Sequence, residues 1–379
     1  MTRFAFSSAF LLFAALMASL LSFPADSAAK ASPALRIGIV ANLSRRTGSD
    51  LVSTAARLRQ AGVQYTKEDV NWDLIEPRRG VFTWSATDAW MSVAARQGLH
   101  VIAVPWSSPR WATPNWNIAP TSGRALSDYV EFVRQVVERY GTQGTFWAQN
   151  PLVPKVPIEY YDIWNEPYCN RFWGGVFPDP AGYARMFKSV VAGARPADPN
   201  AKFLLEADTG AYTKTWPEPP FLSAMFDAVP DLASYAYAVS VHPYSDDGPQ
   251  TCTALSPSRG VNNDWKATRF QVCRLEDVRR ILDAHRASKV RIWITEIGWS
   301  TAPAATKAVT EAAQAQYVHE TFRLLRTSWA RLVDGVVWYA YQTPERDPTN
   351  REDYFGLVHA DGSPKPAWNA FVQEIAPGL

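Results

Sequence analysis

Short apolar segments alternate with amphipathic segments along almost the whole of this 379-residue chain. Residues 128–140 show the helical pattern clearly, because apolar side chains such as Val130, Val133 and Val137 recur every three or four positions. Eight strands that alternate with eight helices predict a parallel sheet. That number favours a single α/β domain, a (β/α)8 TIM barrel without an appended β-sandwich. An open, doubly wound sheet is the alternative, although no glycine-rich dinucleotide motif follows the first expected strand.

The expected elements are short, and both kinds recur at regular intervals. The expected strands are Arg36–Leu43, Val63–Lys67, Val101–Trp106, Ile158–Trp164, Lys202–Glu206, Ala236–His242, Val290–Thr295 and Gly335–Tyr341. The expected helices are Asp50–Gln60, Ala86–Arg96, Asp128–Tyr140, Ala181–Ala192, Phe221–Ala228, Leu275–His285, Glu311–Trp329 and Ala367–Ile375. A parallel barrel places the carboxyl ends of all its strands on one rim, where active sites of such barrels are found.

Residues 1–29 have the composition of a secretory signal peptide. Arg3 supplies a positive charge, Phe4–Phe23 is almost wholly apolar, and Ser27–Ala29 offers small residues for cleavage. An uncleaved membrane anchor is the alternative, because the apolar run approaches the roughly 20 residues that span a bilayer. We therefore expect an exported protein, periplasmic or extracellular, whose residues 30–379 form one domain with no stable membrane insertion after cleavage.

Export makes the three cysteines interpretable. Cys252 and Cys273 flank a polar loop, and a disulfide between them is plausible in an oxidising compartment. Cys169 would lie outside that disulfide, either buried or close to a substrate. The five histidines show no metal-ligand spacing, so we expect neither a metal nor another cofactor.

Charge and aromatic content narrow the class of partner. The formal net charge is only +2, which argues against a nucleic-acid partner. The chain contains 16 tryptophans, and aromatic planes stack on the apolar faces of sugar rings, so the composition favours a carbohydrate substrate. No feature of the sequence indicates an oligomeric state.

Two glutamates follow apolar runs 130 residues apart. Glu166 comes directly after the run that begins at Ile158, and Glu296 comes after the run that begins at Val290. Hydrolysis of a glycosidic bond needs two carboxyl groups that face each other across the sugar, one to protonate the leaving oxygen and one to attack or to activate water. Because both glutamates fall at carboxyl ends of expected strands, the pair indicates this chemistry.

The segments around these glutamates resemble a known group of enzymes. Ile163–Pro167, Ile294–Trp299 and the early segment Trp72–Trp84 resemble the retaining glycoside hydrolases of clan A. The likeness is greatest to family 39 and its bacterial exopolysaccharide-cleaving relatives, and it extends over roughly residues 37–371. It implies that residues 30–379 form a catalytic domain that hydrolyses a β-linked polysaccharide or oligosaccharide. Whether such an enzyme cuts within chains or from their ends stays open.

The resemblance also implies roles for individual residues. Glu166 would be the general acid/base, protonated at rest, and Glu296 the ionised nucleophile, with carboxyl groups about 5–5.5 Å apart. Asn165 would bind the sugar 2-hydroxyl, a contact that strengthens in the transition state. His242 and Tyr244 match the sixth-strand pair of the clan, and Tyr244 would donate its hydroxyl to Glu296.

Four further residues are expected to contact or stabilise the sugar site. Trp338 would form the platform beneath the sugar, with a place in the core as its alternative, and Trp106 and Trp299 would contribute to substrate binding. Lys67 stands where the clan usually has an arginine close to the nucleophile, so its charge is kept while the planar bidentate fork is lost.

Two alternatives share most of these features. One is a barrel that binds carbohydrate without cleaving it, and the altered residue at Lys67 is the feature that favours it. The other is a transglycosylase, which would pass the same covalent intermediate to a sugar acceptor instead of water.

Overall fold

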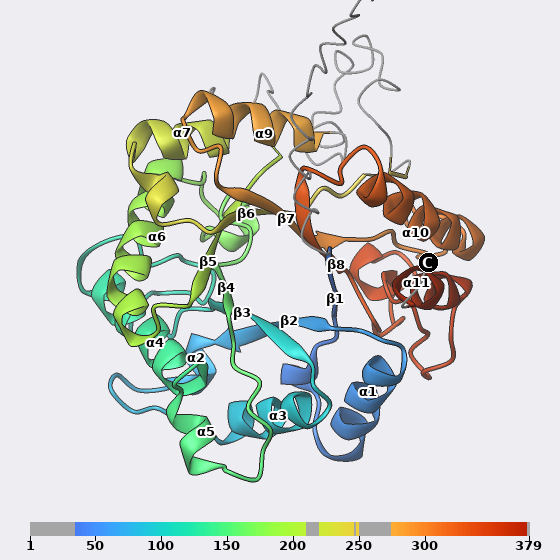
Figure 1. The fold of residues 1–379 in the computed structure, drawn as a ribbon, viewed down its shortest axis with the longest axis horizontal. Coiled ribbons are helices and arrows are strands. Elements are labelled where there is room, and N and C mark those ends of the chain that lie inside the picture. Colours follow the sequence, from blue (N-terminus) through green and yellow to red (C-terminus); the bar gives the residue numbers. More distant parts are fainter. Residues whose placement is uncertain (1–34, 210–219, 246–247, 250–273, 377–379) are drawn as a thin grey trace, which may run out of the picture. The chain divides into compact units, whose positions relative to one another are not determined.

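The computed structural model describes residues 35–209, 220–245, 248–249 and 274–376. Within them, parallel strands β1 to β8 pair in sequence order and close into one barrel, and helices surround it (Figure 1). The predicted (β/α)8 fold is thereby confirmed. The expected signal peptide, the boundary at residue 30, and Cys252 and Cys273 all lie outside the described residues.

The strands are β1 (Arg36–Val40), β2 (Tyr65–Asn71), β3 (His100–Trp106), β4 (Tyr160–Ile163), β5 (Lys202–Ala207), β6 (Ala238–Val241), β7 (Arg291–Ile297) and β8 (Val333–Trp338). The helices between and after them are α1 (Gly48–Gln60), α2 (Trp72–Ile75), α3 (Ser85–Arg96), α4 (Gly123–Tyr140), α5 (Thr145–Gln149), α6 (Pro180–Ala194), α7 (Phe221–Ala228), α9 (Leu275–Ala284), α10 (Glu311–Arg326) and α11 (Pro366–Ile375). Among the described helices, none combines the length and the apolar composition needed to cross a membrane.

Strand β2 differs most from its prediction. It runs from Tyr65 to Asn71 rather than from Val63 to Lys67, so Lys67 is the third residue of the strand and not its last. The polar run after Lys67 hides this strand from a hydropathy pattern. Glu68 is nevertheless buried, because it accepts hydrogen bonds from the Ser44 N–H at 3.0 Å and the Thr66 hydroxyl at 2.6 Å.

The core has two layers, one outside and one inside the sheet. Helix α4 illustrates the outer layer, since it buries Phe132, Val133 and Val136 on the face that its periodicity predicts. Inside the barrel, Tyr160 and Trp293 fill the space near the amino ends of the strands, and their ring centroids are 4.8 Å apart. This aromatic layer fills the interior at the amino ends of the strands, so the interior can open to solvent only at the carboxyl ends.

Candidate active site

The two sequence-predicted glutamates meet at the carboxyl rim of the barrel. Glu166 lies in the loop that follows β4, and Glu296 is the penultimate residue of β7. A carboxylate oxygen of each lies within 4.8 Å of the other. His242 lies between them, with its Nδ1 2.9 Å from Glu166 Oε1 and 3.6 Å from Glu296 Oε2. The structure therefore brings together carboxyl groups that are 130 residues apart in sequence.

Glu296 is held by donors on both of its oxygens. The Lys67 ammonium donates to Oε1 at 3.0 Å, and the Tyr244 hydroxyl donates to Oε2 at 2.8 Å. Burial by itself opposes ionisation, but the charges of His242 and Lys67 and the hydrogen bond from Tyr244 together lower the pKa of Glu296. This carboxylate is thus kept charged in a largely dry site, which is what a nucleophile requires.

Lys67 occupies the position that the sequence comparison with clan A suggested for it. Besides Glu296, it lies 3.1 Å from His242 Nε2 and 3.8 Å from Asp162 Oδ2. Burial disfavours its charge, yet the carboxylates of Glu296, Asp162 and Glu206 raise its pKa above the ordinary value. A compact ammonium therefore contacts several groups at once, where an arginine would commit its fork to one of them.

His242 follows β6 and is fully enclosed by charged groups. Burial lowers the pKa of its imidazole, and so does the charge of Lys67. The carboxylates of Glu296 and Glu206 have the larger effect in the opposite direction, and they raise the pKa of His242 to about 9. The ring lies between charged groups, because its Nε2 is 3.1 Å from Lys67 Nζ and its Nδ1 is 2.9 Å from Glu166 Oε1. An Nδ1–H that donates to Glu166 fits the second of these contacts.

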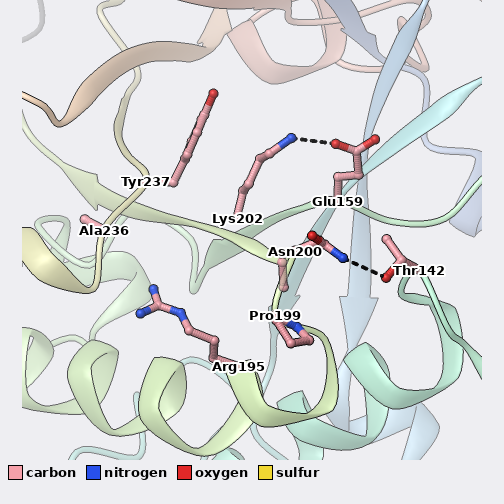
Figure 2. A pocket seen from close by; sticks show the side chains of 9 residues that line it. Thr142, Glu159, Arg195, Pro199, Asn200, Lys202, Ala236 and Tyr237 are labelled. Atoms are coloured by element: carbon pink, nitrogen blue, oxygen red, sulfur yellow. Dashed lines mark hydrogen bonds and ion pairs between the residues drawn. The ribbon is translucent and has the colours of Figure 1, made fainter.

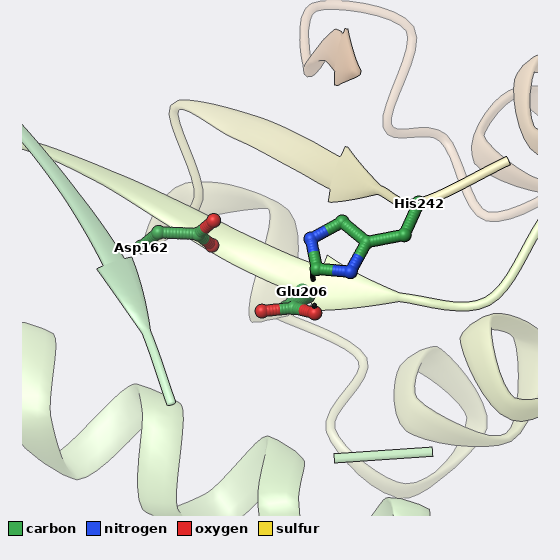
Figure 3. Close-up of side chains that lie close together, drawn as sticks. All are labelled: Asp162, Glu206 and His242. Atoms are coloured by element: carbon green, nitrogen blue, oxygen red, sulfur yellow. Dashed lines mark ion pairs between the residues drawn. The ribbon is translucent and has the colours of Figure 1, made fainter. Parts of the chain in front are cut away.

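Two buried carboxyl groups beneath the rim were not predicted. Asp162 of β4 and Glu206 of β5 have no exposed surface, and they lie with His242 in one cluster (Figure 3). Glu206 Oε1 accepts the backbone N–H of Glu166 at 2.8 Å, and Asp162 Oδ1 accepts from the Ser240 hydroxyl at 2.5 Å. The signal for Glu206 was available, since it ends an expected strand as Glu166 and Glu296 do. Asp162 lies inside a strand and carries no such signal.

Trp338 and Trp299 do not face the site, which corrects the expectation that they contact the sugar. Trp338 has no exposed surface, and Trp299 is 1% exposed. Their rings lie 5.7 Å apart, and Trp338 packs on Phe371 of α11. Successive side chains of a strand point to opposite faces, so Val337 lines the barrel interior while Trp338 points to the helices.

Tyr339, the next residue, faces the site instead. Its ring centroid is 6.2 Å from that of Tyr244, whose hydroxyl donates to Glu296 Oε2. Burial, followed by the charges of Glu296 and Glu352, raises the pKa of the Tyr339 phenol. Gly298 permits this arrangement, because a Cβ at that position would overlap the Tyr339 carbonyl oxygen. The aromatic residue that faces the carboxylates is therefore Tyr339, one residue beyond Trp338.

The remaining predicted residues follow strands β3 and β4. Trp106 ends β3, and its ring centroid is 5.4 Å from that of Trp116 and 5.8 Å from that of Phe172. Trp116 is 44% exposed, so this group of rings reaches solvent. Asn165 is half-buried and directly precedes Glu166. Cys169 is half-buried, and its N–H donates to the Glu166 carbonyl at 2.8 Å.

Within the described residues, two groups of side chains have donor atoms close enough to hold a metal ion. One consists of Glu166, His242 and Glu296, and the other of Asp162, Glu206 and His242. The Lys67 ammonium already provides a fixed positive charge next to His242, Glu296 and Asp162. The donor set is thus better suited to holding protons than to holding a divalent cation.

A separate pocket lies at the amino end of the barrel, away from the carboxylates. Lys202 and Glu159 form an ion pair of 2.6 Å there, and Asn200 donates to the Thr142 hydroxyl at 3.4 Å (Figure 2). Lys202 and Glu159 are partly exposed and pair with each other, and Arg195 donates to the Tyr235 carbonyl at 2.9 Å.

Comparison with solved structures identifies the architecture. A family 39 glycoside hydrolase from Bacteroides cellulosilyticus WH2 superposes with a TM-score of 0.67 at 21% identity. That match covers 91% of this chain and 64% of the other, so this chain spans less than two thirds of that protein. This chain therefore shares the barrel fold of that glycoside hydrolase. The expected resemblance to family 39 is thereby confirmed at the level of the fold.

Two further structures are similar over 90% of this chain. A monomeric β-xylosidase from Caulobacter crescentus CB15 has a TM-score of 0.60 at 16% identity, with 68% of its chain covered. Xylanase 10B from Thermotoga maritima has a TM-score of 0.57 at 15% identity, with 94% covered. No protein-family model and no curated protein sequence matches this chain.

Proposed function

We propose that this protein is a retaining glycosidase in which Glu166 is the general acid/base and Glu296 the nucleophile. One observation carries the proposal. The two carboxylates lie within 4.8 Å of each other at the barrel rim, and only Glu296 is held by a buried ammonium and a phenol. A separation of about 5–5.5 Å is typical of retaining enzymes, whereas inverting enzymes leave about 6.5–9.5 Å for a water molecule.

In the first step, a Glu296 oxygen attacks the anomeric carbon while the Glu166 carboxyl gives its proton to the departing glycosidic oxygen. The products are a glycosyl ester on Glu296 and a free alcohol. Lys67 and Tyr244 hold the attacking carboxylate in place before the reaction, and Asn165, which directly precedes Glu166, binds the 2-hydroxyl.

In the second step, the ionised Glu166 removes a proton from water, and the water oxygen displaces Glu296 from the anomeric carbon. The ester has removed the negative charge of Glu296, so Lys67 and His242 then have one carboxylate fewer to neutralise. Glu166 returns to its protonated form, and no other proton donor is required.

The substrate class follows from the rim and from the similar proteins. The exposed tryptophans near Trp106 suit a chain of sugars rather than a single one. A β-xylosidase, a xylanase and a β-galactosidase are among the similar structures, so we propose a β-linked polysaccharide or oligosaccharide. We further propose export to the periplasm or beyond, directed by residues 1–29. Amino-terminal sequencing of the mature protein checks that proposal.

Release of reducing ends from a panel of bacterial and plant polysaccharides tests the function. Wild type should cut at least one glycan, and Glu166→Gln and Glu296→Gln should each abolish the cut. Binding of glycans by all three proteins without cleavage would instead support a carbohydrate-binding barrel. Larger products on addition of an acceptor sugar would indicate a transglycosylase.

A further inference from the structure

Glu206 is a third glutamate at the carboxyl rim that the two-step reaction does not use. It lies near the end of β5 with no exposed surface. Its Oε1 accepts the backbone N–H of Glu166 at 2.8 Å, and its Oε2 has no hydrogen-bond partner among the described residues. A buried carboxyl with one unsatisfied oxygen is unfavourable for stability, so its presence needs an explanation.

The bond from Glu206 reaches a strained part of the backbone. Glu166 has a φ of 43°, and Trp164, two residues earlier, has a φ of 69°. Side-chain-bearing residues adopt this left-handed region rarely, and surrounding contacts must hold them there. Glu206 supplies such a contact at the peptide of the acid/base itself, so it helps to aim the Glu166 carboxyl.

His242 links the same two glutamates through its ring. Its Nδ1 lies 2.9 Å from Glu166 Oε1, and its Nε2 lies 3.5 Å from Glu206 Oε1 (Figure 3). The imidazole ring therefore lies directly between the Glu166 and Glu206 carboxyl groups.

The charged surroundings of Glu206 come from several elements. Burial is the main reason that the pKa of Glu206 is raised, to about 8, with Asp162 and Glu166 acting in the same direction and His242 and Lys67 opposing it. The phenols of Tyr168 and Tyr183 also face this carboxyl, and Tyr183 accepts the N–H of Glu206 at 3.0 Å.

We propose that Glu206 is a positioning residue for the acid/base: its Oε1 fixes the peptide N–H of Glu166 and so aims the Glu166 carboxyl at the glycosidic oxygen. This inference rests on the proposed function of Glu166. It assigns no contact between Glu206 and the substrate.

The separate responses of kcat and KM test this role. Glu206→Gln keeps an oxygen for the Glu166 N–H, so its kcat should stay within about threefold of wild type. Glu206→Leu removes the acceptor, and its kcat should fall by roughly 10- to 100-fold, with little change in KM.

Glu68→Leu is the matched control. Glu68 is likewise buried and accepts a backbone N–H, but its partners are Ser44 and Thr66 rather than the catalytic groups. Its kcat should stay within about threefold of that of wild type. If Glu206→Leu also keeps the kcat of wild type, the inference is wrong and the proposed function stands.

Thermal unfolding gives a readout that needs no substrate. The Glu206 carboxyl releases its proton near pH 4.5 in the unfolded chain but only near pH 8 in the folded one, so wild-type stability should fall as the pH rises between these values. The Tm of Glu206→Gln should fall less over this range. Parallel curves for the two proteins would contradict the buried, protonated state of Glu206. Inactivity of wild type on every glycan would count only against the proposed function.

Discussion

Each end of the barrel has a Lys–Glu ion pair, but one pair is buried and the other is partly exposed. At the carboxyl end, Lys67 and Glu296 pair at 3.0 Å with side chains only 4% and 15% exposed. At the amino end, Lys202 and Glu159 pair at 2.6 Å, but their side chains are 30% and 36% exposed (Figure 2). The distances are similar, so exposure rather than contact distinguishes the two pairs.

This difference decides what each pair can do. Water screens the charges of an exposed pair, which therefore contributes little to stability. A buried pair is screened poorly, so each charge fixes the protonation state of its neighbours. Substitutions at the carboxyl end should accordingly change the reaction, and substitutions at the amino end should change only folding.

The largest expected effect is the loss of the nucleophile. Glu296→Ala should lower kcat by about 10⁴-fold or more, because no ester can form. Glu159→Gln at the other end should keep wild-type kcat. Initial rates on the glycan that wild type cuts measure both, and equal activity of wild type and Glu296→Ala would remove Glu296 from the mechanism.

Removal of the buried ammonium should come next. Lys67→Met should lower kcat by about 10²- to 10³-fold, because the nucleophile loses both a donor and a neighbouring charge. Without that charge the pKa of Glu296 rises, and Glu296 is protonated at a higher pH. The acid limb of the pH profile should therefore move to higher pH. Lys67→Arg should restore part of the rate, and Lys202→Met should leave the acid limb of the pH profile unchanged.

Loss of a single hydrogen bond should have a smaller effect. Tyr244→Phe removes the donor to Glu296 Oε2 while keeping the ring, so kcat should fall by roughly 10- to 100-fold. A loss as large as that of Glu296→Ala would indicate that the nucleophile is assigned to the wrong residue.

The smallest effect on the reaction is expected at the aromatic layer. The Trp293 ring packs against Tyr160 and against Gly335, so closely that a Cβ at Gly335 would lie 2.6 Å from it. Trp293→Leu therefore leaves a void beneath the site. Unfolding free energy should drop by about 2–4 kcal/mol, with kcat unchanged within about threefold. Denaturant unfolding and initial rates on one protein sample measure both quantities.

The comparison of the two ends also explains what the sequence could predict. Apolar periodicity located the strands and most helices, and the position of Glu166 and Glu296 after apolar runs located the rim. The polar residues of β2 obscured its true extent, since their buried partners, such as Ser44, come from another part of the chain. Side chains alternate along β8, so Trp338 and Tyr339 point to opposite faces of the sheet. The sequence alone does not show which of the two faces the interior.

The most direct test of the retaining pair is to trap the covalent intermediate. Glu166→Gln should react with an aryl glycoside of the sugar that wild type releases, because a good leaving group needs no acid, and should then hydrolyse the ester slowly. We predict that peptide mapping by mass spectrometry finds one glycosyl residue on Glu296. An adduct on another residue, or rapid release of sugar with inverted anomeric configuration and no adduct, would contradict the account.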